Sequence, residues 1–190
     1  MLKKRIKMPI ILSLCAALFL VLGACSNTND ESKENKEDKD HSNMDMNHSS
    51  SGVVPKGLKV AESPTYEVGS QAIIESDHME SMKGAKATIV GAYDTTAYAI
   101  SYTPSNGGDK VENHKWVIRE ELKDAGEKTL EPGAEVTVDA SHMEGMDGAT
   151  AEIDFAEETT VYMVDFTPTN GGEEVKNHKW VTESELTSAE

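Results

Sequence analysis

The chain has 190 residues, a formal net charge of −16 and two cysteines. Such an acidic chain argues against a nucleic-acid partner, because phosphate backbones are bound through Lys and Arg side chains. The length allows two small domains, each near the lower size limit for an independent hydrophobic core.

Residues 1–24 have the organisation of a lipoprotein signal peptide. A basic start is followed by an apolar run over residues 10–22, and small residues stand directly before Cys25. The pattern predicts cleavage before Cys25 and a diacylglyceryl group on its sulfur, with the membrane as a partner. An uncleaved anchor is the alternative, although the apolar run is shorter than the ~20 residues of a spanning helix. Both interpretations place the chain at the outer face of the cell membrane.

The two cysteines leave no thiol in the exported part. Cys15 is removed with the signal peptide and Cys25 is lipidated, so disulfides and thiolate metal sites are excluded. Loss of the four basic residues of the signal peptide moves the net charge from −16 to −20. That charge attracts cations, but it is also common in soluble exported proteins.

Residues 25–52 form a polar segment that we expect to be a flexible tether, because it has little apolar surface to bury. Its end contains an unusual group of soft ligands, namely His41, Met44, Met46 and His48. Thioether and imidazole groups suit late transition metals, so this group is a candidate copper site. Chance occurrence in an unstructured tract is the alternative. Residues 53–67, with turns marked by Pro and Gly, lead into the folded part.

The folded part is a tandem repeat. A shift of 64 residues aligns His78 with His142 and Trp116 with Trp180, and nearly half of the aligned positions are identical. We therefore expect repeat 1 over residues 68–126 and repeat 2 over residues 132–190.

Alternating apolar and polar residues predict an all-β fold for both repeats, with inward stripes such as Ala151, Ile153 and Phe155. The expected strands are residues 71–75, 86–92, 97–103 and 114–118 in repeat 1, and residues 135–139, 150–156, 161–167 and 178–182 in repeat 2. Asp94-Thr95 and Glu158-Thr159 fall where a tight hairpin turn would join the second and third strands. A final helical turn brings Leu122 or Leu186 to the end of the sheet. This order is similar to that of an SH3-like small barrel, so we expect two SH3-like repeats packed together.

Each repeat carries the motif His-Met-Glu-x-Met-x-Gly-Ala in a loop after its first strand. We expect the loop to turn its imidazole and both thioethers toward one point. His and Met ligands without Cys select copper, as Cu(I), over harder ions. The candidate metal ligands are His78, Met79 and Met82 in repeat 1 and His142, Met143 and Met146 in repeat 2. The alternative is that the methionines fill a core, for which they are well suited.

The motif Asn-His-Lys-Trp-Val also recurs, at residues 113–117 and 177–181. Strand alternation puts each His on the same face as the Trp two residues later, away from the core. Such an aromatic face needs a partner, which is the other repeat, the His-Met loop or a ligand. His114 and His178 are thus further candidate metal ligands, and Trp116 and Trp180 are candidate aromatic neighbours of a bound cation.

Two acidic residues are candidates for holding the loop histidines. Glu80 and Glu144 are hard carboxylates, so we expect them to orient His78 and His142 rather than to bind a soft ion. No set of residues suggests a catalytic nucleophile with its base, so the chain is not expected to be an enzyme.

These motifs, together with Thr-Pro-Ser/Thr-Asn-Gly-Gly, resemble the YdhK family of Gram-positive lipoproteins over residues 69–189. The resemblance implies a copper-binding lipoprotein that limits copper uptake or toxicity at the cell surface. We expect a monomer whose further partner is a copper exporter or a cell-wall component. The alternative function is a metal-free interaction module that binds a peptide or wall component through Trp116 and Trp180.

Overall fold

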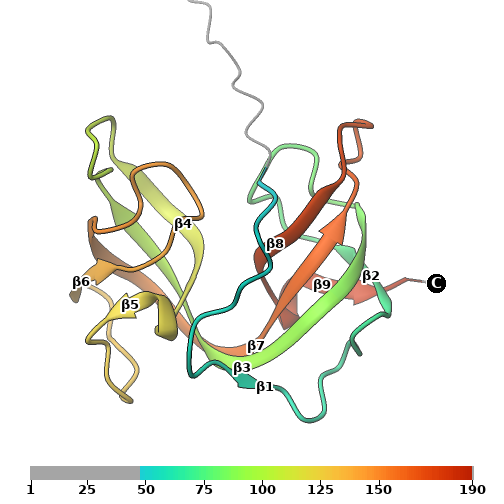
Figure 1. The fold of residues 1–190 in the computed structure, drawn as a ribbon, viewed down its shortest axis with the longest axis horizontal. Helices are drawn as coiled ribbons and strands as arrows, with labels where there is room; N and C mark the ends of the chain where they lie inside the picture. Colours follow the sequence, from blue (N-terminus) through green and yellow to red (C-terminus); the bar gives the residue numbers. More distant parts are fainter. Residues whose placement is uncertain (1–47, 190) are drawn as a thin grey trace, which may run out of the picture. The chain divides into compact units, whose positions relative to one another are not determined.

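A computed structural model describes residues 48–189, all of which belong to the compact unit Met44–Glu190 (Figure 1). The signal peptide, Cys25 and three of the tether ligands, His41, Met44 and Met46, lie outside the described residues. No helix within the described range is long and apolar enough to span a membrane.

The described chain forms nine strands and two single-turn 3-10 helices, which confirms the all-β prediction. In chain order they are β1 Lys59–Val60, β2 Gln71–Ile74, β3 Lys86–Tyr102, β4 Val111–Ile118, η1 Arg119–Glu121, β5 Leu122–Lys123, β6 Glu135–Val138, β7 Thr150–Phe166, β8 Val175–Thr182, η2 Glu183–Glu185 and β9 Leu186–Ser188. The strands form one sheet with the order β5-β6-β7-β3-β2-β9, to which β1, β4 and β8 attach. Leu122 and Leu186 follow the predicted helical turns and are buried.

The two longest strands, β3 and β7, correct the predicted hairpins. Each has 17 residues, and they pair antiparallel from Ala87↔Phe166 to Tyr102↔Ala151. Asp94-Thr95 and Glu158-Thr159 lie inside these strands, where Asp94 pairs with Thr160 and Thr95 with Thr159. The physical reason is local. A two-residue hairpin needs a residue that accepts positive φ, whereas β-branched Thr favours extended backbone.

Because β3 and β7 continue without a turn, each apolar core is built from one half of each repeat. The first lobe joins β2 and the first half of β3 to the second half of β7, β8 and β9, around Ile74, Met82, Ile89, Tyr162, Val164 and Phe166. The second lobe joins the second half of β3, β4 and β5 to β6 and the first half of β7, around Tyr98, Ile100, Tyr102, Val138, Met146 and Ile153. The prediction of one SH3-like barrel per repeat is not confirmed, since the sheet stays open between β5 and β9.

The predicted inward stripes are confirmed except at Phe155. Ala151 and Ile153 are buried, but Phe155 is 50% exposed. The register explains this, since Ile153 pairs with Ile100 and Phe155 with the preceding residue, Ala99. The residue between them is extra, and such a bulge moves the following side chain to the other face.

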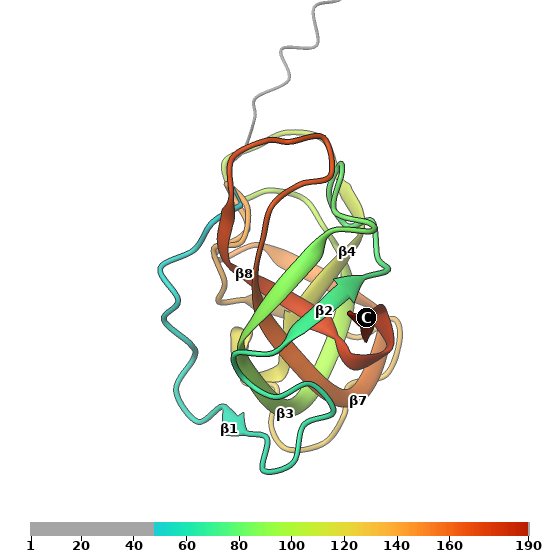
Figure 2. The same ribbon diagram turned by 90° about the vertical axis from the view of Figure 1, so that its right-hand side faces the viewer.

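A third apolar cluster joins the two lobes. It contains Trp116, Trp180 and the aliphatic residues Ala97, Ala99, Ile118, Val161 and Met163. Val54 and Leu58 pack against this cluster from the segment that precedes β1. We call residues 48–58 the strap, because they run beside β8 and end where β1 pairs with the middle of β3 (Figures 1 and 2).

Candidate functional site

The His-Met loops are tight turns between β2 and β3 and between β6 and β7. The amide of Met82 donates to the carbonyl of Met79 at 3.3 Å, and Gly84, at φ 80°, donates to Ile74 at 2.7 Å. The second loop repeats these bonds from Met146 to Met143 at 3.2 Å and from Gly148 to Val138 at 2.9 Å. Glycine accepts this positive φ without steric cost.

The second methionine of each loop lies in a core. Met82 belongs to the first lobe and Met146 to the second, and both have 0% exposure. This corrects the expectation that all three side chains of a loop turn toward one point. Met82 and Met146 fill apolar space, which is the alternative interpretation of the motif. Met79 and Met143 are only partly buried and pack at the margins of the same cores.

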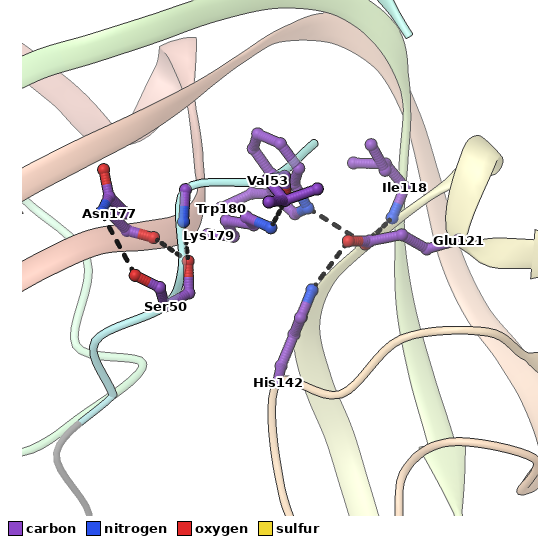
Figure 3. Close-up of polar contacts among 9 residues, drawn as sticks. Ser50, Val53, Ile118, Glu121, His142, Asn177, Lys179 and Trp180 are labelled. Carbon is purple, nitrogen blue, oxygen red and sulfur yellow. Dashed lines mark hydrogen bonds and ion pairs between the residues drawn. The ribbon is translucent and has the colours of Figure 1, made fainter. Parts of the chain in front are cut away.

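The loop histidines are held by carboxylates of the opposite repeat. His78 Nε2 lies 2.6 Å from Glu185 Oε1, and Glu185 Oε2 accepts a bond of 2.8 Å from Trp116 Nε1. Equivalent bonds link His142 Nε2 to Glu121 Oε1 at 2.9 Å and Trp180 Nε1 to Glu121 Oε2 at 3.0 Å (Figure 3). Each carboxylate also accepts from a backbone amide, that of Thr182 or Ile118.

These bonds decide which nitrogen of each loop imidazole carries a proton. Burial alone raises the pKa of Glu185, but hydrogen bonds from His78, Thr182 and Trp116 outweigh it and hold this pKa below its usual range. An ionised carboxylate only accepts hydrogen bonds, so His78 Nε2 must carry the proton. The Nδ1 atom of a neutral His78 is then left with a free lone pair, and His142 is arranged in the same way beside Glu121.

Four imidazole nitrogens are buried without a hydrogen-bond partner in the described part of the chain. They are Nδ1 of His78 and His142 and Nε2 of His114 and His178. A buried polar atom without a partner costs about 1–3 kcal/mol, so native structures keep few of them unless a water, an ion or a function explains them. Here the same two positions recur in both lobes.

Two of the four free nitrogens belong to neighbouring rings. In the second lobe His114, on β4, lies 6.3 Å from His142 between ring centres, and Tyr102 lies edge-on to His114 at 6.1 Å. The Tyr102 hydroxyl donates to Met143 Sδ at 3.8 Å, which places a thioether at the same site. In the first lobe the 64-residue repeat gives His178, His78 and Met79 as the counterparts of these residues. There Phe166 lies edge-on to His178 at 5.7 Å, and the His78 ring lies 6.1 Å from that of Trp116.

The Asn-His-Lys-Trp motif positions the strand histidines through a local irregularity. Asn113 and Asn177 have φ of 52° and 53°, a region that Asn tolerates better than most residues. Their amides donate to Ser101 Oγ at 3.1 Å and Asp165 Oδ1 at 2.7 Å. The pairing of β4 with β3 and of β8 with β7 shifts register here, and His114 then pairs with Ile100 and His178 with Val164.

Burial keeps the strand histidines neutral. Together with the smaller effect of the neighbouring histidines, it lowers the pKa of His114 to about 4 and that of His178 to about 3. His48, at the start of the strap, is one of these neighbours, and burial lowers its own pKa as well. Neutral imidazole is the form that binds metals, so the site is ready for a ligand at neutral pH.

The spacing of His114 and His142 fits a metal with few ligands. Imidazole nitrogen binds a metal at ~2.0 Å, so two ring centres on opposite sides of one ion lie about 6 Å apart. Within residues 48–189, no three His, Cys, Asp or Glu side chains are arranged to hold a metal. A site here therefore needs two imidazoles and a thioether, which is a donor set for a soft ion.

The tryptophans face the protein interior. Trp116 is 4% exposed and Trp180 is 0% exposed. Two of the three expected partners are found at Trp116, because Glu185 and Phe155 come from the other repeat and His78 of the His-Met loop lies edge-on to the indole at 6.1 Å. The ammonium groups of Lys115 and Lys179 lie 5.0 and 5.8 Å from the centres of these indole rings. The indole faces are thus occupied by lysine, which argues against stacking on a bound ion and against a role as exposed peptide-binding aromatics.

The carboxylates that hold the loop histidines differ from those expected. Glu80 and Glu144 are exposed, and Glu144 binds the Asn106 side chain at 3.2 Å. Glu121 and Glu185 hold the loop histidines instead. Their identity at equivalent positions was visible in the sequence, but they lie far along the chain from the histidines they contact.

Comparisons with known proteins agree with the duplicated motifs. Residues 68–119 and 132–183 each match the family described as "Protein of unknown function (DUF1541)". The chain belongs to this family. It is 59% identical to the "Uncharacterized protein YdhK" of Bacillus subtilis over 177 residues, which cover 92% of this chain and 86% of that protein.

Solved structures of family members share the fold. The chain matches a crystal structure of ydhK from Bacillus subtilis with a TM-score of 0.73 and 65% identity, covering 76% of this chain and 99% of that one. A solution structure of the ydhK C-terminal domain matches with a TM-score of 0.61 and 69% identity, covering 64% of this chain and 92% of that one.

Proposed function

We propose that the chain is a membrane-anchored, non-enzymatic lipoprotein that binds Cu(I) and contributes to copper tolerance. One observation carries the proposal. In the second lobe, two neighbouring imidazoles have buried nitrogens without a hydrogen-bond partner, beside a thioether, and the first lobe has the same residue types at the equivalent positions. The loop imidazole of each lobe is also held through its other nitrogen by a largely buried carboxylate, the arrangement typical of metal-binding histidines.

The proposed ligands are one set per lobe. His142 Nδ1, His114 Nε2 and Met143 Sδ would hold an ion in the second lobe, and His78 Nδ1, His178 Nε2 and Met79 Sδ in the first. A set of imidazole and thioether without carboxylate or thiolate favours Cu(I) over zinc, magnesium or calcium. Each set combines ligands from both repeats, so the stoichiometry is one ion per lobe.

The tether has an accessory role in this proposal. His41, Met44 and Met46 directly precede His48, and His48 lies near the strand histidines. The tether would capture ions at the membrane surface, to which a diacylglyceryl group on Cys25 attaches the chain. Storage of the metal or its transfer to an exporter are both compatible with such a role.

The methionines provide the test. In a Cu(I) titration of the purified full-length chain against a competing chelator, Met79→Leu/Met143→Leu should lower the affinity of two ions about 10-fold or more. Met82→Leu/Met146→Leu is the matched control, because it also replaces two thioethers but only within the cores. It should bind Cu(I) like the unmodified chain.

Equal binding by both double variants would overturn the proposed sites. So would a loss of binding that is larger in the control than in the Met79/Met143 variant. Circular dichroism of both variants checks that the fold is retained, since Met and Leu differ little in volume.

A further inference from the structure

The duplication creates two equivalent strand edges but only one strap. On β8, Ser50 donates its amide to the Lys176 carbonyl at 2.9 Å and its hydroxyl to the Asn177 carbonyl at 2.7 Å. Asn177 Nδ2 returns a bond to the Ser50 carbonyl at 3.2 Å, and Lys179 Nζ donates to the carbonyl of Val53 (Figure 3). The strap therefore covers the outer edge of β8.

The equivalent edge on β4 offers the same groups. Asn113 and Lys115 occupy the positions of Asn177 and Lys179 and are the same residue types. Glu112 replaces Lys176, which meets Ser50 through its backbone carbonyl. β4 pairs only with β3 in the described part of the chain, and no bond from the strap reaches it. In Figure 2 the strap lies toward the side of β8.

The aromatic residues beside the two strand edges also differ in exposure. Tyr93 packs edge-on against Trp180 at 5.8 Å, and Phe155 packs against Trp116 at 6.3 Å. Phe155 occupies the repeat position of Gly91, where a Cβ atom would lie 2.6 Å from the Tyr93 hydroxyl and 2.7 Å from its ring, so each lobe has room for one ring here. Tyr93 lies in the cluster to which the strap contributes Val54 and Leu58 and is partly buried, whereas Phe155 is 50% exposed.

Exposure along the two strands supports an open site at β4. Asn177 and His178 are more buried than their counterparts Asn113 and His114. Trp180 is 0% exposed and Trp116 is 4% exposed. The edge of β8 is thus covered by hydrogen bonds from the strap. The edge of β4 has none of these bonds, although Val54 and Leu58 pack on the cluster that contains Trp116.

The described residues 48–189 offer no second strap for this edge. The residues of repeat 2 that correspond to residues 48–58 would be residues 112–122, and these already form β4, η1 and the start of β5. The occupant that we propose is therefore a segment of another polypeptide. It should be extended, with a small hydroxyl residue matching Ser50 and apolar residues matching Val54 and Leu58.

Charge adds a further requirement. Glu112 stands where the strap side has Lys176, and Glu157 stands where it has Tyr93. Burial and the nearby Glu185 raise the pKa of Glu157 more than the nearby Lys115 lowers it, so a further cation placed beside this carboxylate would be favourable. We propose that the outer edge of β4, with Phe155 and Glu157, binds an extended basic segment of a partner polypeptide in the way that β8 binds the strap. The proposal does not depend on copper.

The probe is a synthetic peptide with the sequence of residues 48–61, in which His48 and Val60 are replaced by lysine. Added to the full-length chain, it should shift the amide NMR signals of residues 111–117 and 155–158 and leave those of residues 176–180 unchanged. At low salt it should bind several-fold more tightly than the unmodified peptide, because its lysines face Glu112 and Glu157. A scrambled peptide of the same composition should not bind.

Two variants complete the test. Phe155→Thr should weaken binding about 10-fold by removing the apolar contact. Glu112→Gln/Glu157→Gln should remove the advantage of the lysine peptide. Unchanged NMR signals elsewhere in the chain show that both variants are folded. No binding, shifts at β8 through exchange with the strap, or equal affinity for Phe155→Thr would each overturn the proposal.

Discussion

At the scale of single residues, the crossed bonds of Glu121 and Glu185 are the centre of this protein. Each carboxylate joins a histidine and a tryptophan of the other repeat, within 3.0 Å of both. Such bonds hold the ring orientation and the tautomer, and thereby present the free nitrogen of each loop histidine.

Replacing these carboxylates should affect stability and metal binding together. Glu121→Gln/Glu185→Gln should lower the free energy of unfolding by about 1–3 kcal/mol for each site, because charged hydrogen bonds at a buried position are lost. It should also weaken Cu(I) binding about 10- to 100-fold. Urea denaturation and chelator competition measure the two effects. Glu80→Gln/Glu144→Gln is the matched control and should change neither, since both residues are exposed.

The strand histidines predict how stability depends on pH. The folded-state pKa values of His114 and His178, about 4 and about 3, lie below the ordinary imidazole value. The unfolded chain therefore binds more protons between about pH 4 and pH 6.5, so stability is complete above this range and falls as the pH falls. We expect a loss of the order of 2–3 kcal/mol per histidine at pH 4. Urea denaturation at pH 7 and pH 4 measures it, and His114→Phe should reduce the difference.

At the scale of elements, the continuity of β3 and β7 decides the architecture. Their pairing, with Asp94↔Thr160 and Thr95↔Thr159 near its middle, carries both strands from one lobe into the other. The alternation of apolar residues on either side of this point was read correctly from the sequence. The sequence does not show that the two apolar stripes belong to one continuous strand, because a short polar dipeptide is compatible with a turn and with an exposed strand segment.

Changing this point to a turn sequence should destabilise the fold. Asp94→Asn/Thr95→Gly introduces the dipeptide preferred in hairpin turns and removes a β-branched residue from a strand. The free energy of unfolding should fall by about 1 kcal/mol, measured by urea denaturation. Asp94→Asn alone should have little effect. A more stable double variant would contradict the importance of strand continuity.

At the scale of the whole molecule, the two repeats complete each other's cores. The first lobe needs Tyr162, Val164 and Phe166 of repeat 2, and the second needs Tyr98, Ile100 and Tyr102 of repeat 1. A single repeat would expose half of each core to water. The duplication is therefore a requirement of this fold.

An isolated repeat should not fold as a monomer. A chain of residues 68–126 should be unfolded at low concentration, or should form a dimer in which a second copy supplies the missing strands. Circular dichroism and light scattering over a range of concentrations test this. A folded monomer would show that each repeat closes its own core, and would contradict the shared lobes.

The sequence by itself determined the all-β class, the two repeats, the buried stripes and the family, because periodicity and recurrence are local properties of the chain. It also named the histidines and the methionine of each proposed set, which stay a prediction. Only the tertiary structure decided that Met82 and Met146 lie in the cores, that the tryptophans face inward, and that Glu121 and Glu185 cross to the other repeat. The physical reason is that these contacts depend on whether two 17-residue strands turn or continue, and pairing over such distances leaves no signal within either repeat alone.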